Sequence, residues 1–341
     1  MLSMFWFCLV AITLTGYVLL DGFVLGVGIL QLFVAHSEDD RTQTLSSIGP
    51  VWDGNEVWLL VLGGMLFLAF PALYASAFSG FYLALMIVLW LLILRGASIE
   101  FRNHVDNSEW KQLWSMVFGL ASTALALVFG VALGNVIRGV PLDRTGYFFL
   151  PLWTDFRPFG QVGVIDWYTL LVGVASALTL AVHGGLWLVL KTEGDFEERA
   201  RRFAARCWTA LFALMLAVTA ASFAIQPNFS SQFRKYPWGA AFVVLAVAGM
   251  IGERVLSRRR RDLQAFLASG LSIAGMLCSA AFGVFPNLLP SNTAPELGLT
   301  IYNAATADHG LVVGLWWSLP GMALAIGYSV FVYRRFAGKL A

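Results

Sequence analysis

The segment GPVWDGNEVWLLVLGGMLFLAF, residues 49–70, sets two carboxylates and an amide immediately before a long apolar run. The run itself, residues 57–70, forms a helix of only ~21 Å at 1.5 Å per residue, whereas the hydrocarbon core of a bilayer is ~30 Å thick. The preceding Asp53, Asn55 and Glu56 must therefore join the helix if this segment crosses a membrane. Asp53 and Glu56 stand three residues apart, so they share one face of that helix.

The composition of the whole chain indicates a membrane protein. Of its 341 residues, 59% are hydrophobic and 12% are charged, while a soluble domain has about a quarter charged residues. The three cysteines form no CxxC pair, so neither a disulfide framework nor a zinc site is indicated. The net charge of +2 does not point to nucleic acid, and we expect no such partner.

Apolar runs of about 20 residues are long enough to cross a bilayer as helices, and about nine of them follow one another along the chain. The links between them are too short for a soluble domain, so we predict a single all-α integral membrane domain over residues 1–341. The candidate spans are about 5–34, 51–72, 76–95, 113–137, 166–190, 204–225, 238–256, 263–285 and 310–333.

The distribution of Lys and Arg predicts how the chain is oriented in the membrane. Seventeen of the 22 basic residues lie in or beside the links after the odd-numbered spans and in the C-terminal tail. Cytosolic links carry such an excess. We therefore predict an outside N-terminus and a cytosolic C-terminus.

Two segments suggest an internal repeat. LLDGFVLGVGIL (19–30) and LAVHGGLWLVL (180–190) lie at similar depths in spans one and five, and each is followed by an acidic link. The repeat units would be residues 1–137 and 166–285, with residues 310–333 as an additional helix. One shared glycine aligns the two segments, so chance similarity stays an open alternative. The glycines of GVGIL and VLGGM are typical of close helix packing.

Carboxylates inside membrane spans are costly and usually mark proton or ion routes. Asp21 lies ~24 Å along the first span at 1.5 Å per residue, in the half that we assign to the cytosol. With Asp53, Glu56 and Glu100 it would form a proton entrance on that side. Two structural alternatives remain open. An acid such as Asp53 in a first helical turn is favoured by the helix dipole, and Glu100 has arginines on either side for a salt bridge, Arg95 and Arg102.

The histidines do not suggest a haem site, because no two occupy facing spans at matched depth. His36 and His104 fall in links, His309 begins the last span, and only His183 lies within the membrane. For His183, packing or a hydrogen bond inside the bundle is favoured over metal binding.

Five segments together are similar to subunit II of the cytochrome bd-type quinol oxidases, and the resemblance runs from about residue 12 to GKL at the C-terminus. The segments are TGYVLLDGFVLGVGIL (15–30), GPVWDGNEVWLL (49–60), LRGASIEFR (94–102), GVALGNVIRGVPLD (130–143) and FPNLLPSNTAPELGLTIYNAA (285–305).

The resemblance implies two four-helix units plus one extra helix, paired with a subunit I that ligates haem b and haem d. The complex would oxidise quinol and reduce dioxygen to water in a bacterial or archaeal cytoplasmic membrane, and this chain alone would not be catalytic. Asp21 and Asp53 correspond to acids of a cytosolic proton path, and Trp58 to a tryptophan near an oxygen-access route. Some members carry a structural quinone in subunit II, and a small single-helix accessory subunit is a further partner to expect.

One position departs from the family pattern DGFDLGVG, since Val24 replaces the second acid. We expect proton flow to continue through the remaining acids. The rival function is a proton-coupled secondary transporter or channel with its site at Asp21, Asp53 and His183, because midplane acids and repeats also mark transporters. A purely structural assembly factor is a third class.

Overall fold

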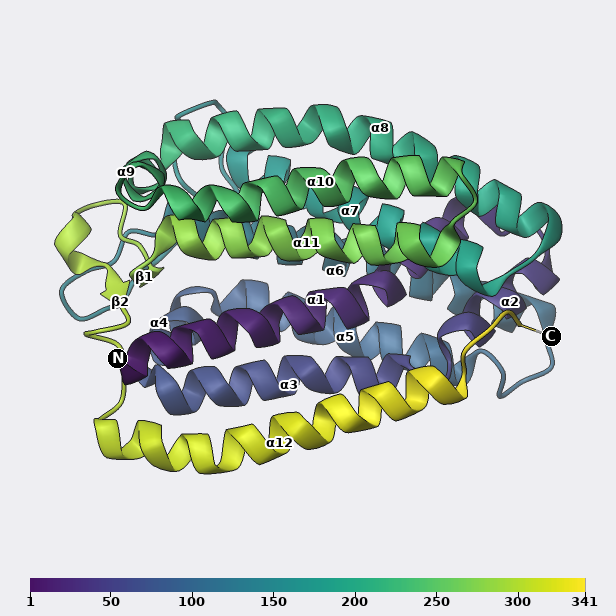
Figure 1. Cartoon of the computed structure of the whole chain (residues 1–341), viewed down its shortest axis with the longest axis horizontal. Helices are drawn as coiled ribbons and strands as arrows, with labels where there is room; N and C mark the ends of the chain where they lie inside the picture. Colours follow the sequence, from purple (N-terminus) through teal and green to yellow (C-terminus); the bar gives the residue numbers. More distant parts are fainter. Residues whose placement is uncertain (341) are drawn as a thin grey trace.

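The computed structural model describes residues 1–340 as a bundle of long helices that run side by side (Figure 1). Among the described residues, eight helices are long and apolar enough to cross a membrane, and nine if the bent pair α2–α3 counts as one span. The α-helices are α1 (Leu2–Val34), α2 (Glu38–Ile48), α3 (Trp52–Ala69), α4 (Pro71–Gly80), α5 (Tyr82–Phe101), α6 (Ser108–Arg138), α7 (Trp167–Lys191), α8 (Gly194–Ile225), α9 (Pro227–Lys235), α10 (Ala240–Arg258), α11 (Asp262–Val284) and α12 (Asp308–Arg335). The all-α prediction with about nine spans is confirmed.

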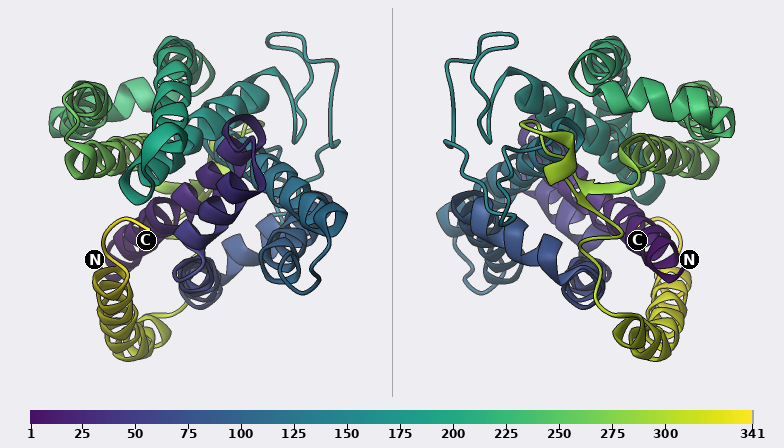
Figure 2. Two further views of the ribbon diagram at one scale, coloured as in Figure 1. Left: turned by 90° about the vertical axis from the view of Figure 1, so that its right-hand side faces the viewer. Right: turned by 90° about the vertical axis from the view of Figure 1, so that its left-hand side faces the viewer.

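Helices α1 and α7 form the centre of the bundle. In their most apolar stretches 72% of the residues are buried, against 17% in α5, α8 and α12. In one group, helix α1 packs with α3 and α6, and α6 also packs with α5. In the other group, α7 packs with α8 and α11, and α11 packs with α10. The bundle thus has two four-helix groups, and α12 lies outside them against α3 (Figures 1 and 2). The sequence repeat between the two groups stays a prediction.

Glycines allow the two central helices to touch backbone to backbone. A Cβ atom on Gly26 would lie 1.8 Å from the carbonyl oxygen of Leu180, and one on Gly184 would lie 2.3 Å from the carbonyl carbon of Gly26. Close packing was therefore the right interpretation of GVGIL. It was wrong for VLGGM, because Cβ atoms on Gly63 and Gly64 would meet nothing within 4 Å.

The third span lies further along the chain than the predicted 76–95. Helix α3 ends at Ala69, Pro71 starts the short helix α4, and α5 then runs over Tyr82–Phe101. Proline cannot continue a helix from within but fits its first turn. At the other end, hydrophobicity falls at Arg95, yet the helix continues because Arg95 is buried in an ion pair.

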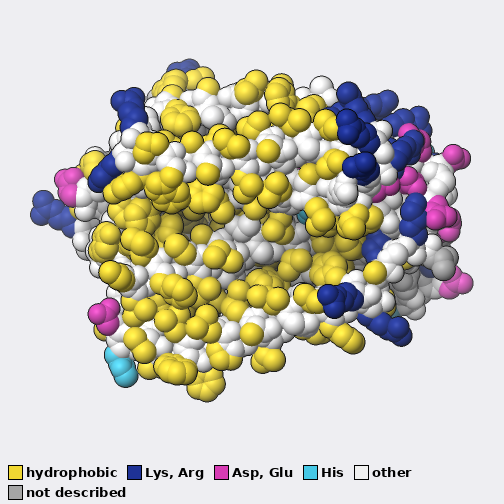
Figure 3. All heavy atoms as spheres, viewed as in Figure 1, with side chains coloured by type: hydrophobic (Ala, Val, Ile, Leu, Met, Phe, Trp, Pro, Cys, Tyr) yellow, Lys and Arg dark blue, Asp and Glu magenta, His cyan; other side chains and the backbone are white. Residues whose placement is uncertain are grey.

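The two ends of the bundle differ. Lys and Arg gather at the end that carries α2 and the C-terminal tail (Figure 3), which we name the basic end. The opposite end holds the links 139–166 and 285–307, where β1 (Asn287–Leu289) and β2 (Leu299–Thr300) form a small antiparallel sheet. The N-terminus lies at the opposite end and the C-terminal tail at the basic end. Which end faces the cytosol stays a prediction.

Candidate functional site: a buried ion cluster between α1, α3 and α5

Asp21 and Arg95 form an ion pair in the middle of the protein. Both side chains are 0% exposed, and Nη1 of Arg95 donates to both carboxylate oxygens of Asp21, at 2.9 and 2.8 Å. Each charge alone would be very costly to bury, and each is tolerated because the other is within contact distance. This pairing joins α1 to α5 across 74 positions of sequence.

Glu56 of α3 is the third member of the cluster. Its Oε2 atom lies 3.2 Å from Nη2 of Arg95, and its side chain is 23% exposed. Among the described residues Nη2 has no hydrogen-bond partner, so the contact with Glu56 is an ion pair without hydrogen-bond geometry. Arg95 thus faces two carboxylates and binds them unequally.

Helix α1 is held at three consecutive residues by polar side chains of three other helices. Nε2 of His183 donates to the carbonyl oxygen of Leu19 at 3.1 Å, and Nδ2 of Asn55 donates to that of Leu20 at 2.7 Å. The third residue, Asp21, carries the ion pair. Hydrogen bonds of this kind are strong in an apolar surrounding, so they fix the height of Asp21 in the bundle.

Helix α12 reaches the same cluster through one hydroxyl group. Tyr333 donates to Oδ1 of Asn55 at 3.0 Å. Asn55 therefore bonds α1 with its amide nitrogen and α12 with its oxygen, while its neighbour Glu56 faces Arg95. Asn55 and Glu56 are adjacent in α3, and adjacent helical positions point in different directions. For this reason Asn55 can face α1 and α12 while Glu56 faces Arg95.

His183 is buried and both of its ring nitrogens are engaged. Besides the bond to Leu19, Nδ1 lies 2.7 Å from Oγ of Ser269 on α11, and the ring stacks on Phe266 at 4.6 Å between centroids. The carbonyl acceptor requires a hydrogen on Nε2, so Nδ1 of the neutral ring is an acceptor. The one hydroxyl hydrogen of Ser269 is shared between Nδ1 and the carbonyl oxygen of Phe266, which lies 2.7 Å from Oγ. The interpretation as a hydrogen-bonded residue inside the bundle agrees with this arrangement.

Asp53 and Glu100 are placed outside the cluster. Asp53 lies exposed in the first turn of α3, where the helix dipole favours it. Glu100 is also exposed, and the salt bridge predicted for it is wrong: within residues 1–340 its carboxylate pairs with neither arginine. Arg95 turns to Asp21, and Arg102 pairs with Glu38 of α2. Positions two apart on a helix do not face each other, so Arg102 could not meet Glu100 along its own helix.

Trp58 and Val24 lie in the packed interior. Trp58 is 7% exposed and covers Gly16, whose added Cβ would meet its ring at 3.1 Å. Val24 is 0% exposed and lies one turn beyond Asp21 on α1. An acid at that position would point from the same face as Asp21.

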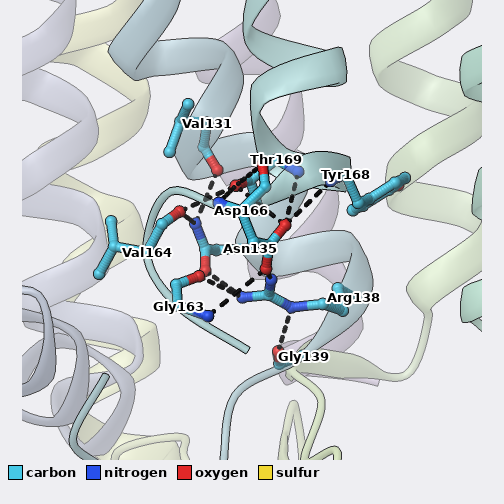
Figure 4. Close-up of polar contacts among 9 residues, drawn as sticks. All are labelled: Val131, Asn135, Arg138, Gly139, Gly163, Val164, Asp166, Tyr168 and Thr169. Carbon is cyan, nitrogen blue, oxygen red and sulfur yellow. Dashed lines mark hydrogen bonds and ion pairs between the residues drawn. The ribbon is translucent and has the colours of Figure 1, made fainter. Parts of the chain in front are cut away.

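Sequence reasoning missed a second buried polar cluster, at the opposite end of the bundle (Figure 4). Arg138 at the end of α6 pairs with Asp166, and its Nη2 donates to the carbonyl oxygen of Gly163 at 3.1 Å. Asp166 also caps α7, with Thr169 as the third residue of a capping box. The D-x-x-T spacing before an apolar run was the signal for this cap. The cluster fastens the link 139–166 to the bundle, because Asn135 and Arg138 of α6 donate to the carbonyl oxygens of Val164 and Gly163.

Comparison with known proteins decides the family. A family model described as cytochrome bd terminal oxidase subunit II matches residues 2–336. This chain belongs to the cytochrome bd oxidase subunit II family. Subunit II of Bacillus subtilis, named cytochrome bd ubiquinol oxidase subunit 2, is 32% identical over 98% of this chain and 96% of its own length. A probable cytochrome oxidase subunit 2 of Haemophilus influenzae is 32% identical over 99% and 95%.

The fold agrees with that assignment. A chain in the structure of bd oxidase from Geobacillus thermodenitrificans aligns with a TM-score of 0.79 at 18% identity, covering 98% of both chains. Membership in the subunit II family makes this protein a multi-pass membrane subunit of a terminal oxidase, and it decides against the transporter alternative.

The bd oxidase family uses haem, and inside the bundle the described residues offer no histidine with a free ring nitrogen for it. No group of three or more His, Cys, Asp or Glu side chains in residues 1–340 is arranged to hold a metal ion. His183, the one histidine inside the bundle, has both ring nitrogens in hydrogen bonds. The remaining histidines, His36, His104 and His309, are exposed.

Proposed function

We propose that this chain is the non-haem-ligating subunit of a complex that oxidises quinol and reduces dioxygen to water. Its partner would be a haem-bearing subunit I that holds haem b and haem d, in the cytoplasmic membrane of a bacterium or archaeon. The support is membership of the subunit II family, together with the hydrogen bonds that engage both ring nitrogens of His183, the one histidine inside the bundle.

The chain's own contribution, in this proposal, is a proton path that starts at the basic end. The observation that carries it is a gradient of burial along α3 and inward: Asp53 is exposed, Glu56 is 23% exposed, and Asp21 is 0% exposed. Asp53 and Glu56 share one helix face, and Glu56 and Asp21 share Arg95. A run of carboxylates from the surface to the interior is typical of proton routes in membrane proteins.

Glu100 stands beside this path at the surface. It lines a cavity of about 500 Å³ between α2, the start of α3 and the end of α5, together with Trp52 and Arg102. We place Glu100 at the mouth of the path, where it would raise the local concentration of protons. We rank it below Asp53, because Asp53 lies three residues before Glu56 on the same helix, whereas Glu100 lies on α5.

Other roles rest on the resemblance alone. Trp58 would border a route for dioxygen, and its packing on α1 supports a fixed wall there. The exposed apolar faces of α5, α8 and α12 suit lipid, the quinone pool and subunit contacts, including a small single-helix subunit. A structural quinone in this chain would need one of these faces.

The test of this function is purification through an affinity tag on this chain. The complex should contain a second, haem-bearing subunit and should consume dioxygen when quinol is added. The chain expressed without that partner should show no haem absorption. Stoichiometric haem bound to the chain alone, or a haem-free complex that transports a solute, would overturn the proposal.

A further inference from the structure

The cluster around Arg95 has more negative than positive charge. The charged groups that act on Glu56 are Asp21 from α1, Arg95 from α5 and Asp53 on its own helix. Helix α12 contributes only the hydroxyl of Tyr333, which is bonded to Asn55. One guanidinium therefore faces two inner carboxylates, and a low-dielectric interior does not hold both of them ionised with a single counter-charge.

The geometry decides which of the two keeps its charge. Asp21 is fully buried, and both of its oxygens accept from Arg95 at 2.8–2.9 Å. Protonating it would replace one of these bonds and remove the main counter-charge of the buried guanidinium, a large penalty. Glu56 has a single contact of 3.2 Å outside hydrogen-bond geometry, and its side chain is partly exposed. Protonating Glu56 gives up only this one contact.

We infer that Glu56, and not Asp21, is the group that binds and releases the proton on this path, and that Asp21 with Arg95 is a fixed ion pair that positions it. This inference rests on the proposed proton path and changes the role of its members. The family resemblance assigned Asp21, and not Glu56, to the path. The partner of Asp21 lies 74 residues away and is invisible in the linear order.

The steps conserve charge and protons. A proton from water at the basic end, collected by Asp53, adds to the carboxylate of Glu56 and gives the neutral acid. Arg95 then balances Asp21 alone, so the inner cluster is electrically neutral. Release of the proton towards the site of oxygen reduction in the partner regenerates the Glu56 carboxylate beside Arg95. Four such transfers supply the four protons that combine with dioxygen and four electrons to give two waters.

The experiment uses the assembled complex and infrared difference spectra between reduced and oxidised forms. If Glu56 changes protonation, a band of a protonated carboxylic acid should be present in the natural complex, absent in Glu56→Gln and shifted in Glu56→Asp. Turnover should fall about 100-fold in Glu56→Gln, within the range that a positioned proton-transfer group contributes, and Glu56→Asp should recover most of it. Glu109→Gln, an exposed acid in the first turn of α6 at the same end, is the matched control and should change neither readout.

Three results would overturn the inference. These are a missing band in the natural complex, a band that persists in Glu56→Gln, and normal turnover of Glu56→Gln while Asp53→Asn is slow. The last outcome would leave the proton path intact but remove Glu56 from it. If neither variant slows a fully assembled complex, the proposed path itself fails. Should Glu56→Gln not assemble, the natural complex and Glu56→Asp still decide whether the band belongs to Glu56.

Discussion

At the scale of single residues, the buried ion pair shows how a charge survives inside a membrane protein. Arg95 and Asp21 are both 0% exposed, and each is the main compensation for the other. A buried ion pair adds little net stability over an apolar pair, but the loss of one partner leaves the other charge buried without compensation. The pair is therefore a fixed feature of the fold as well as a neighbour of the proposed path.

Arg95→Met should destabilise the protein by about 3–5 kcal/mol, the usual penalty for breaking a buried pair from one side. Thermal unfolding of the detergent-solubilised complex measures this loss. The double variant Asp21→Asn with Arg95→Met should recover a large part of it, because no charge is then left unpaired. If the double variant is no more stable than Arg95→Met, the pair does not act as a unit.

Asp53→Asn removes a titratable group but keeps its size, and we expect quinol oxidase turnover to fall strongly at normal haem content. Asp53 is exposed at the start of α3 and one turn before Glu56, so its loss would slow proton collection. If the only role of Asp53 is its favourable interaction with the dipole of α3, the variant should lose about 0.3–1 kcal/mol of stability and keep full turnover. Turnover, haem spectrum and thermal stability of the same preparation separate the two roles.

At the scale of helices, contacts between α1 and α7 set the heights of the functional residues. The two helices run in the same direction, since Gly22 and Gly26 meet Leu180 and Gly184 in matching order. Close approach at Gly26 and Gly184 brings His183 within reach of Leu19. The position of Asp21 therefore depends on Gly26 and Gly184, which have no functional side chain of their own.

Gly184→Ala should separate these helices, because the added Cβ would lie 2.3 Å from the backbone of Gly26. Overpacking of this kind costs about 1–3 kcal/mol, and we expect lower yield of assembled complex and weaker turnover. Gly252→Ala on α10 is the matched control, as its Cβ would make an ordinary contact of 3.4 Å with Ala268. Equal thermal stability of the two variants would show that the α1–α7 contact tolerates extra volume.

At the scale of the whole molecule, Lys and Arg gather at the basic end of the bundle on the face drawn in Figure 3. The C-terminal tail belongs to this end. The amide of Leu340 donates to the carbonyl oxygen of Lys191 at 2.8 Å, and Nζ of Lys339 donates to that of Thr192 at 2.8 Å. The tail thus connects α12, which otherwise packs on the first helix group, to α7 in the second.

A reporter joined to the C-terminus through a linker should be active only on the cytosolic side. The charge bias of the links predicts this orientation, and the linker leaves the contacts of Lys339 and Leu340 intact. Activity of paired reporters, one that works in the cytosol and one that works outside, measures it. A C-terminus outside would reverse the orientation and would place the acids of the proposed path on the wrong side.

The sequence by itself determined what depends on composition and local order. Long apolar runs are sufficient to predict spans, because a bilayer demands about 20 apolar residues from each helix. The spacing in WDGNE predicted that Asp53 and Glu56 share a face, and long motifs predicted the family. The third span was misplaced because its end is stabilised by a partner elsewhere in the chain: Arg95 looks like a terminus in sequence and is a buried residue in the fold.

Only the tertiary structure decided which charges meet. Asp21, Glu56 and Arg95 lie on three helices, and nothing in the linear order says that Arg95 turns away from Glu100, five residues along the same helix, towards Asp21. The same holds for Asn55, Tyr333 and His183, each of which bonds a residue far along the chain. The physical reason is that local spacing fixes which face of a helix a side chain occupies, while its partner depends on how that helix packs against the others.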